Sequence, residues 1–148
     1  MDAQPLVQDW MSKDPVTADI DLPILEAHRL MTDHRIRRLP VMDRGALVGI
    51  VTLGDVRGAE PSEATSLSIW ELNYLLSKLT VERVMSTPVV TVRPDDPVPE
   101  AARLMLTHKI AGLPVLDGDD LVGIITESDI FRMVVNHWQR KPAAVAAL

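Results

Sequence analysis

Residues 47–55 have the sequence Leu-Val-Gly-Ile-Val-Thr-Leu-Gly-Asp, and residues 121–129 have the sequence Leu-Val-Gly-Ile-Ile-Thr-Glu-Ser-Asp. The two stretches lie half a chain length apart in a chain of 148 residues, and the region around them repeats at the same offset. About half of the positions from 11 to 55 are identical to those from 85 to 129, without a gap. A match of this kind indicates a tandem duplication.

Each half is predicted to fold as β-α-β-β-α. A short extended piece (16–18 or 89–92) precedes a helix that has Pro23 or Pro97 near its first turn. A hairpin follows, formed by residues 39–42 and 47–51 or by 113–116 and 121–125. The proline in the first hairpin strand fits a strand end or edge better than a centre. The second strand is fully apolar, which predicts burial on both faces, and Thr52 or Thr126 then opens another helix.

The repeat sets the predicted domain limits. We expect repeat 1 with an N-terminal segment over 1–60, a connector over 61–80 and repeat 2 over 81–148. Residues 58–63 look like a loop, and 68–79 look helical, with five aliphatic side chains on one face and Trp70 and Tyr74 beside it. That helix either covers the open side of the fold or contacts another copy. A last helix is expected from about 128 to 138, before an alanine-rich tail.

Composition excludes several classes of protein. Fifteen basic against 21 acidic residues give a net charge of −6, which disfavours non-specific binding to nucleic acid. The chain has no cysteine, so it holds no disulfide or thiolate metal site. Aromatic residues make up 3% of the chain, which predicts an aliphatic core. No stretch resembles a targeting signal or a transmembrane segment, so a cytoplasmic protein without a membrane partner is expected.

The pattern Gly-x-x-Thr-x-x-Asp occurs once in each repeat, as Gly49, Thr52 and Asp55 and again at 123, 126 and 129. From spacing alone, the favoured interpretation is a helix start, with threonine as the N-cap and an acid three residues later. The same geometry suits a ligand, because a carboxylate at a strand-to-helix turn can accept hydrogen bonds from two ribose hydroxyls. The threonine hydroxyl and nearby N–H groups can meet a phosphate. A glycine at this place lets a ligand or a neighbouring backbone come close.

These motifs, in this order, resemble a tandem pair of CBS domains, known as a Bateman module. The resemblance rests on Met-Ser-Thr-Pro-Val-Val-Thr at 85–91, the helix at 100–105, His-Lys-Ile-Ala-Gly-Leu-Pro-Val-Leu-Asp at 108–117 and the stretch at 121–129, each matched in repeat 1. It covers nearly the whole chain. It implies a mixed α/β fold whose repeats pack about a pseudo-twofold axis. It also implies a regulatory module that binds AMP, ADP, ATP or S-adenosylmethionine in the cleft between the repeats.

The resemblance also implies roles for individual residues. Asp55 and Asp129 would hold ribose hydroxyls, and Thr52 and Thr126 would lie near ribose and phosphate. Adenine would lie against residues on the two flanking segments of each repeat, namely Val16, Thr17, Ile36, Val90, Thr91 and Ile110, next to Arg37 and Ala111. Because repeat 1 has Arg37-Arg38 where repeat 2 has Ala111-Gly112, we expect two unequal sites.

The basic residues near these segments have two interpretations. Arg37 and Arg38 are candidate phosphate ligands, because guanidinium groups suit phosphate oxygens; a solvated surface is the alternative. His108 and Lys109 are candidate phosphate ligands in repeat 2, although a histidine at a helix end more often acts through the helix dipole. No histidine spacing indicates a metal site, and no nucleophile has a base beside it, so no catalytic residue and no required cofactor are expected.

Two functions therefore remain. The first is an adenine-nucleotide sensor that shifts the equilibrium with an unknown regulated protein. The second is a structural dimerisation module without a physiological ligand; CBS pairs commonly form homodimers, as the resemblance implies. The chain would also suit the role of a detached regulatory part of a larger enzyme or transporter.

Overall fold

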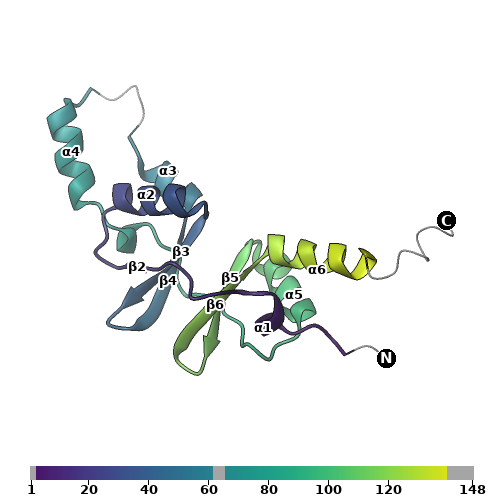
Figure 1. The fold of residues 1–148 in the computed structure, drawn as a ribbon. Coiled ribbons are helices and arrows are strands. Elements are labelled where there is room, and N and C mark those ends of the chain that lie inside the picture. The colour runs from purple at the N-terminus through teal and green to yellow at the C-terminus, as the bar shows by residue number, and fades with distance from the viewer. Residues whose placement is uncertain (1–2, 62–65, 140–148) are drawn as a thin grey trace. The chain divides into compact units, whose positions relative to one another are not determined.

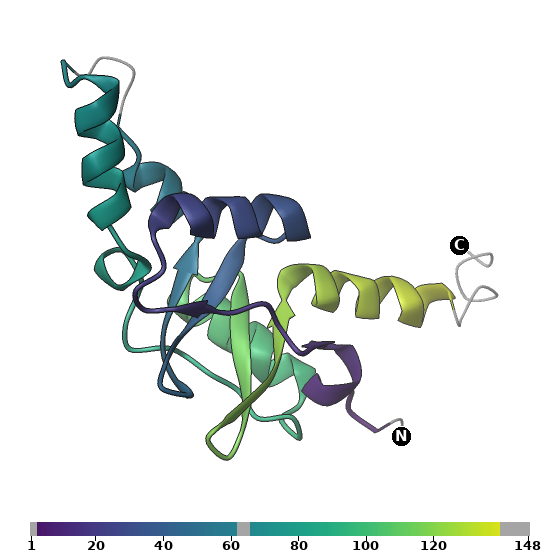
Figure 2. The ribbon, with the colours of Figure 1, turned by 60° about the vertical axis from the view of Figure 1, so that its left-hand side comes forward.

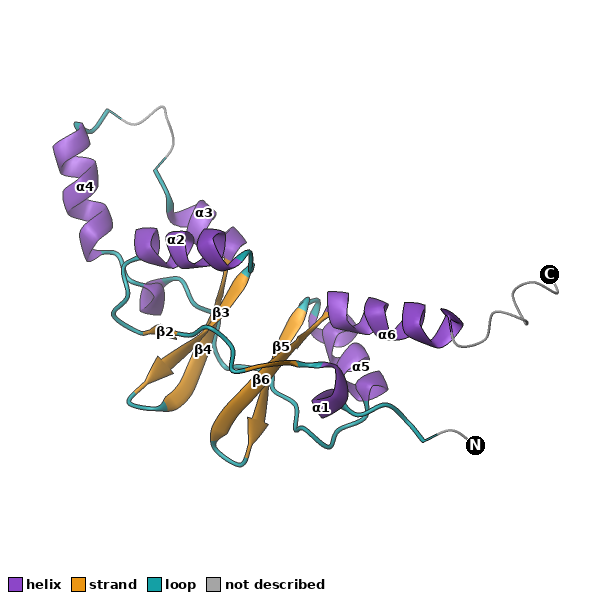
Figure 3. Ribbon diagram, viewed as in Figure 1, coloured by secondary structure: helices purple, strands orange, loops and turns teal. Residues whose placement is uncertain are grey.

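The computed structural model describes residues 3–61 and 66–139. Figure 1 shows their elements in chain order and Figure 3 distinguishes helices from strands. The helices are α1 (Val7–Trp10), α2 (Ile24–His34), α3 (Leu53–Ala59), α4 (Ile69–Lys78), a 3-10 turn (Val81–Arg83), α5 (Val98–His108) and α6 (Glu127–Gln139). The strands are β1 (Ser12–Lys13), β2 (Ala18–Asp19), β3 (Arg38–Asp43), β4 (Ala46–Thr52), β5 (Gly112–Asp117) and β6 (Asp120–Thr126). The mixed α/β fold class is as predicted.

The chain forms two compact units. The central unit is Pro15–Val89, and the terminal unit combines Met1–Asp14 with Val90–Leu148. These limits differ from those of the sequence repeats because each hairpin pairs with the Met-Ser segment of the other repeat. Ser12 and Lys13 pair with Ile124 and Gly123 of β6. The predicted domain limits at 60 and 80 follow the sequence repeat, whereas the two units are groups of residues that contact one another.

Each unit contains one three-stranded sheet. The order is β2-β3-β4 in the central unit and β1-β6-β5 in the terminal unit. Both hairpins are antiparallel and carry a register shift at the same place, between Val41 and Met42 and between Val115 and Leu116. The duplication therefore extends to the irregularities of the backbone.

The two prolines of the hairpins lie in equivalent surroundings. Pro114 is on β5, and the next residue, Val115, forms a parallel bridge with Val92. Pro40 is on β3, and the next residue, Val41, pairs in parallel with Ala18 of β2. Strand β2 pairs only with Val41 and Met42, so Pro40 lies beyond its end. A middle strand can hold proline where its neighbour is this short.

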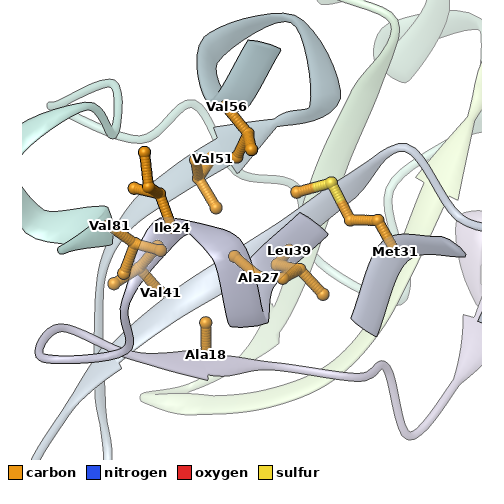
Figure 4. Packing of buried hydrophobic residues seen from close by; sticks show 9 residues of the cluster. All are labelled: Ala18, Ile24, Ala27, Met31, Leu39, Val41, Val51, Val56 and Val81. Carbon is orange, nitrogen blue, oxygen red and sulfur yellow. The ribbon is translucent and has the colours of Figure 1, made fainter. Parts of the chain in front are cut away.

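The core of the central unit is aliphatic, as predicted. Figure 4 shows that α2 contributes Ile24, Ala27 and Met31, which pack with side chains of β3, β4 and α3. The same helix lies along one side of the sheet in Figure 2. Nine buried residues form this cluster, namely Ala18, Ile24, Ala27, Met31, Leu39, Val41, Val51, Val56 and Val81. The terminal unit has an equivalent cluster, which includes Val98, Ala101 and Met105 of α5. Burial of such side chains contributes about 1.5–3 kcal/mol each.

The apolar strands β4 and β6 are not buried on both faces, and that prediction is wrong. In β4, Gly49 and Val51 are buried, while Val48 and Ile50 are only half-buried. Strand β6 has the same pattern. The alternation indicates that one face of each strand is fully covered and the other is not.

The connector contains helix α4, which begins after Ser68. The Ser68 hydroxyl oxygen accepts a hydrogen bond from the Glu71 N–H at 3.2 Å. Leu76 and Leu79 pack against the central core, as expected for a covering helix. Ile69 and Leu75, which the sequence places on the same apolar face, are exposed instead. The loop expected from residue 58 begins later, because α3 continues to Ala59; residues 62–65 and the tail from 140 lie outside the described residues.

None of the helices in the described parts of the chain combines the length and the apolar character needed to cross a membrane.

Candidate functional site

The turn from β4 into α3 places Thr52 and Asp55 against each other. The Thr52 N–H donates to Asp55 Oδ2 at 2.9 Å, and the Asp55 N–H donates to Thr52 Oγ1 at 3.2 Å. This is a complete capping box, which confirms the helix-start interpretation. It also fixes the carboxylate at the turn, half-buried, where a ligand hydroxyl can still approach it.

The equivalent turn from β6 into α6 differs in its hydrogen bonds. The Thr126 N–H and hydroxyl both donate to Asp129 Oδ2, at 2.8 Å and 3.2 Å. Arg132, one helical turn later, donates to Asp129 Oδ1. Asp129 is 4% exposed, and a charged group at that depth needs a partner. Arg132 supplies the charge that makes its burial tolerable.

The two glycines of the motif admit a neighbouring segment of chain. A Cβ atom at Gly49 would meet the side chain of Met85, and one at Gly123 would meet the Met11 side chain and the Ser12 carbonyl oxygen, at 2.8 Å. Each glycine therefore makes room for the Met-Ser segment that pairs with its strand. The approach of a neighbouring segment, one of the two that the sequence allows, is present at both glycines.

The segment before each Leu-Pro pair lies against the strand-to-helix turn. The Leu53 N–H donates to the Arg37 carbonyl at 2.7 Å, and the Glu127 N–H donates to the Ala111 carbonyl at 3.0 Å. Beside this contact, the central unit has an open hollow of about 400 Å³, lined by Arg37, Arg38, Thr52, Leu53, Gly54 and Arg57. The predicted ribose threonine and the two predicted phosphate arginines thus line one site.

Arg57 also lines this hollow, and it is not among the residues predicted from the sequence. It lies five residues after Thr52, in the last turn of α3. The sequence contains one signal for Arg57, namely that the aligned residue of repeat 2 is the apolar Phe131. A comparison of the repeats beyond the last shared aspartate would have pointed to this difference.

The predicted adenine residues are divided between the two units. Val16 and Ile36 are half-buried against the core of the central unit, and Thr17 is exposed. Val90 and Ile110 pack in the same way against the core of the terminal unit, and Thr91 is half-buried. Each unit therefore holds the complete predicted set from one repeat. Their contact with adenine stays a prediction.

His108 and Lys109 lie at the end of α5. Both are exposed, and Lys109 caps the helix in the left-handed conformation with φ 54°. No hydrogen bond or ion pair within residues 3–61 and 66–139 connects them to the turn at Thr126. Their assignment to phosphate therefore stays a prediction.

The comparisons with known proteins identify the fold. Residues 7–62 and 81–136 both match the CBS domain family, so the chain belongs to the CBS domain family and carries a tandem pair. The chain is 36% identical to L-aspartate semialdehyde sulfurtransferase of Methanocaldococcus jannaschii over 130 residues, which are 86% of this chain. Those residues are 23% of that protein, so the chain spans about a quarter of its length.

Solved structures of CBS domain pairs share the fold. The pair of protein MJ0100, in complex with 5′-methylthioadenosine and S-adenosyl-L-methionine, is 34% identical with a TM-score of 0.76 and covers 91% of this chain and 99% of its own. CBSX2 in complex with AMP is 27% identical with a TM-score of 0.73, covering 89% and 97%. The resemblance inferred from the sequence motifs is thereby confirmed.

Proposed function

We propose that this protein is a regulatory module that binds adenosine-containing ligands, such as AMP, ADP, ATP or S-adenosylmethionine. The observation that carries the proposal is the Thr-x-x-Asp turn, which is present and intact in both units. The similarity to domain pairs in complex with AMP or with S-adenosyl-L-methionine supports it. Binding would shift an equilibrium with a regulated protein of the cytoplasm.

The proposed residue roles follow the two turns. Asp55 and Asp129 accept hydrogen bonds from ribose hydroxyls, and Thr52 and Thr126 hold these carboxylates in place. A carboxylate has about four acceptor positions, so the single bond that Asp55 accepts and the three that Asp129 accepts both leave capacity for a ligand. Side chains of the flanking segments contact adenine in each unit, namely Val16, Thr17 and Ile36 in one and Val90, Thr91 and Ile110 in the other. The proposal includes no catalytic step.

Thermal unfolding with and without ligand tests the proposal. AMP, ADP, ATP, S-adenosylmethionine and NADH should be compared at millimolar concentration. A ligand that binds the folded state adds about 2.7 kcal/mol to the free energy of unfolding at 100 times its Kd. Asp55→Ala and Asp129→Ala should each remove the binding of one site. If none of the adenosine ligands raises the unfolding temperature, the proposal is wrong.

A second candidate function is self-association without a physiological ligand. Helix α4 exposes Trp70 (80%) and Tyr74 (60%), and α6 exposes Phe131 (62%) and Trp138 (53%). Exposed apolar surface of this kind favours a protein contact. Sedimentation at micromolar concentration tests for a homodimer, and Trp70→Lys should weaken it if α4 is the contact. A monomer that binds nucleotide tightly would leave only the sensor function.

A further inference from the structure

Resting on the proposed adenosine-binding function, we infer that the two sites select different ligands. The site of the central unit takes an adenosine ligand that carries phosphate, with Arg37 and Arg57 as the residues that hold the phosphate. The site of the terminal unit takes a phosphate-free adenosine ligand, such as a nucleoside with a thioether at its 5′ position. The difference arises at four aligned positions around the shared Thr-x-x-Asp pattern.

The central site concentrates positive charge. Arg37 and Arg57 come from different elements, both are exposed, and both line the hollow beside Thr52. Within the described residues, neither forms an ion pair, so no carboxylate neutralises them there. Guanidinium groups match phosphate oxygens through paired N–H donors. On a chain with a net charge of −6, this is a local site for an anion.

The terminal site lacks these groups. Its aligned residues are Ala111 for Arg37, Gly112 for Arg38 and Phe131 for Arg57. Arg132 is present where repeat 1 has Gly58, but it is bonded to the buried Asp129. Turning Arg132 toward a phosphate would leave the buried carboxylate without its cation, with only the Thr126 N–H and hydroxyl as donors, which is unfavourable. Arg132 is therefore not available to bind a phosphate.

The aromatic ring at the terminal site suits a different substituent. Phe131 is 62% exposed on α6, at the position where the central unit has Arg57. A thioether sulfur makes favourable contacts with aromatic rings. A phosphate at the same place would meet an apolar ring where the central unit offers the guanidinium of Arg57. The terminal site therefore discriminates against phosphate and accepts an apolar 5′ group.

Isothermal titration of the full chain with AMP and with 5′-methylthioadenosine tests the inference. Arg37→Ala and Arg57→Ala should each weaken AMP binding roughly tenfold, because each removes a charge-assisted contact. The affinity for 5′-methylthioadenosine should stay within twofold. Arg29→Ala is the matched control, since Arg29 is an exposed arginine of the same unit that does not line the hollow. Unchanged AMP affinity in both site variants would overturn the inference.

A reciprocal variant tests the terminal site. Phe131→Arg introduces a guanidinium where the central unit has one, and the exposed position makes it compatible with folding. We expect it to create a second AMP site and to weaken 5′-methylthioadenosine at least fivefold. If Phe131→Arg changes neither affinity, the selection at the terminal site is refuted. If neither ligand binds the unmodified chain while ADP, ATP or S-adenosylmethionine does, this inference is wrong and the proposed function stands. If none of these ligands binds, the proposed function itself is contradicted, whereas binding of both ligands without dependence on arginine contradicts only this inference.

Discussion

The turns at Thr52 and Thr126 have the same Thr-x-x-Asp hydrogen bond and differ in the charged side chains around it. Both join an antiparallel hairpin to a helix, both follow a register shift at the same position, and both aim an aspartate back at the threonine. Yet three arginines line the hollow at the first turn, while at the second the arginine is bonded to the aspartate. The duplication has kept the residues that the backbone requires and changed the side chains around them. Ligand choice can therefore diverge without altering the fold.

The largest difference in stability should appear at the two motif glycines. Gly123→Ala places a Cβ atom 2.8 Å from the Ser12 carbonyl oxygen, so backbone must move, and we expect a loss of about 3 kcal/mol. Gly49→Ala meets only the flexible side chain of Met85, and about 1 kcal/mol is expected. Urea unfolding of both variants measures the difference. Equal losses would show that the two Met-Ser segments constrain their strands equally.

Of the two aspartates, Asp129 should contribute more to the free energy of unfolding than Asp55. Asp129→Ala removes three hydrogen bonds to a buried carboxylate, one of them from Arg132, and should lower the free energy of unfolding by about 2 kcal/mol. Asp55→Ala removes one side of an accessible capping box, and about 1 kcal/mol is expected. Chemical denaturation without ligand checks both. A greater loss for Asp55→Ala would contradict the contrast drawn between the turns.

The smallest expected difference in stability lies between α2 and α5, the helices that precede the two hairpins. Glu100 and Arg103 of α5 form an ion pair in which Arg103 Nε donates to Glu100 Oε2 at 3.0 Å, and this hydrogen bond holds the pKa of Glu100 below its usual value. The aligned Glu26 and Arg29 of α2 form no such pair within the described residues.

A depressed pKa in the folded state stabilises the protein above the unfolded pKa, and this contribution disappears as the pH falls through the folded pKa. Because the pair is exposed, the effect on stability is small. An NMR titration should show the pKa of Glu100 rising in Arg103→Ala. An unchanged pKa would mean that the pair does not persist in solution.

Much of the fold follows from the sequence because its signals are local and occur twice. Helices α2 and α5 appear where the apolar spacing after Pro23 and Pro97 places them, and Thr52 and Thr126 lie at the predicted turns. The first strand of each repeat is shorter than predicted. β2 has two residues, and in repeat 2 only a bridge between Val92 and Val115 remains.

The pairings that the sequence analysis missed are not local. Strand β1 has two residues, which is too short to show a period, and its partner is β6 near the other end of the chain. The burial of β4 on one face was also missed, because an apolar run does not reveal which neighbours cover it. Within the site, the Thr-x-x-Asp pattern follows from the identities between the repeats, whereas Arg57 and Arg132 lie where the repeats differ, and only a comparison of those differences points to them.

The pairing of Ser12 and Lys13 with β6 also sets an order of assembly during synthesis. The central unit has all of its residues once Val89 has been made, and it can fold while the ribosome continues. The terminal unit must wait, because its N-terminal strand has no partner until Ile124 emerges. Ser12 and Lys13 thus reach these native contacts only after residues 123 and 124 have been made. For the duration of that delay, they form a strand segment without its partner, which lies more than 100 residues further along the chain.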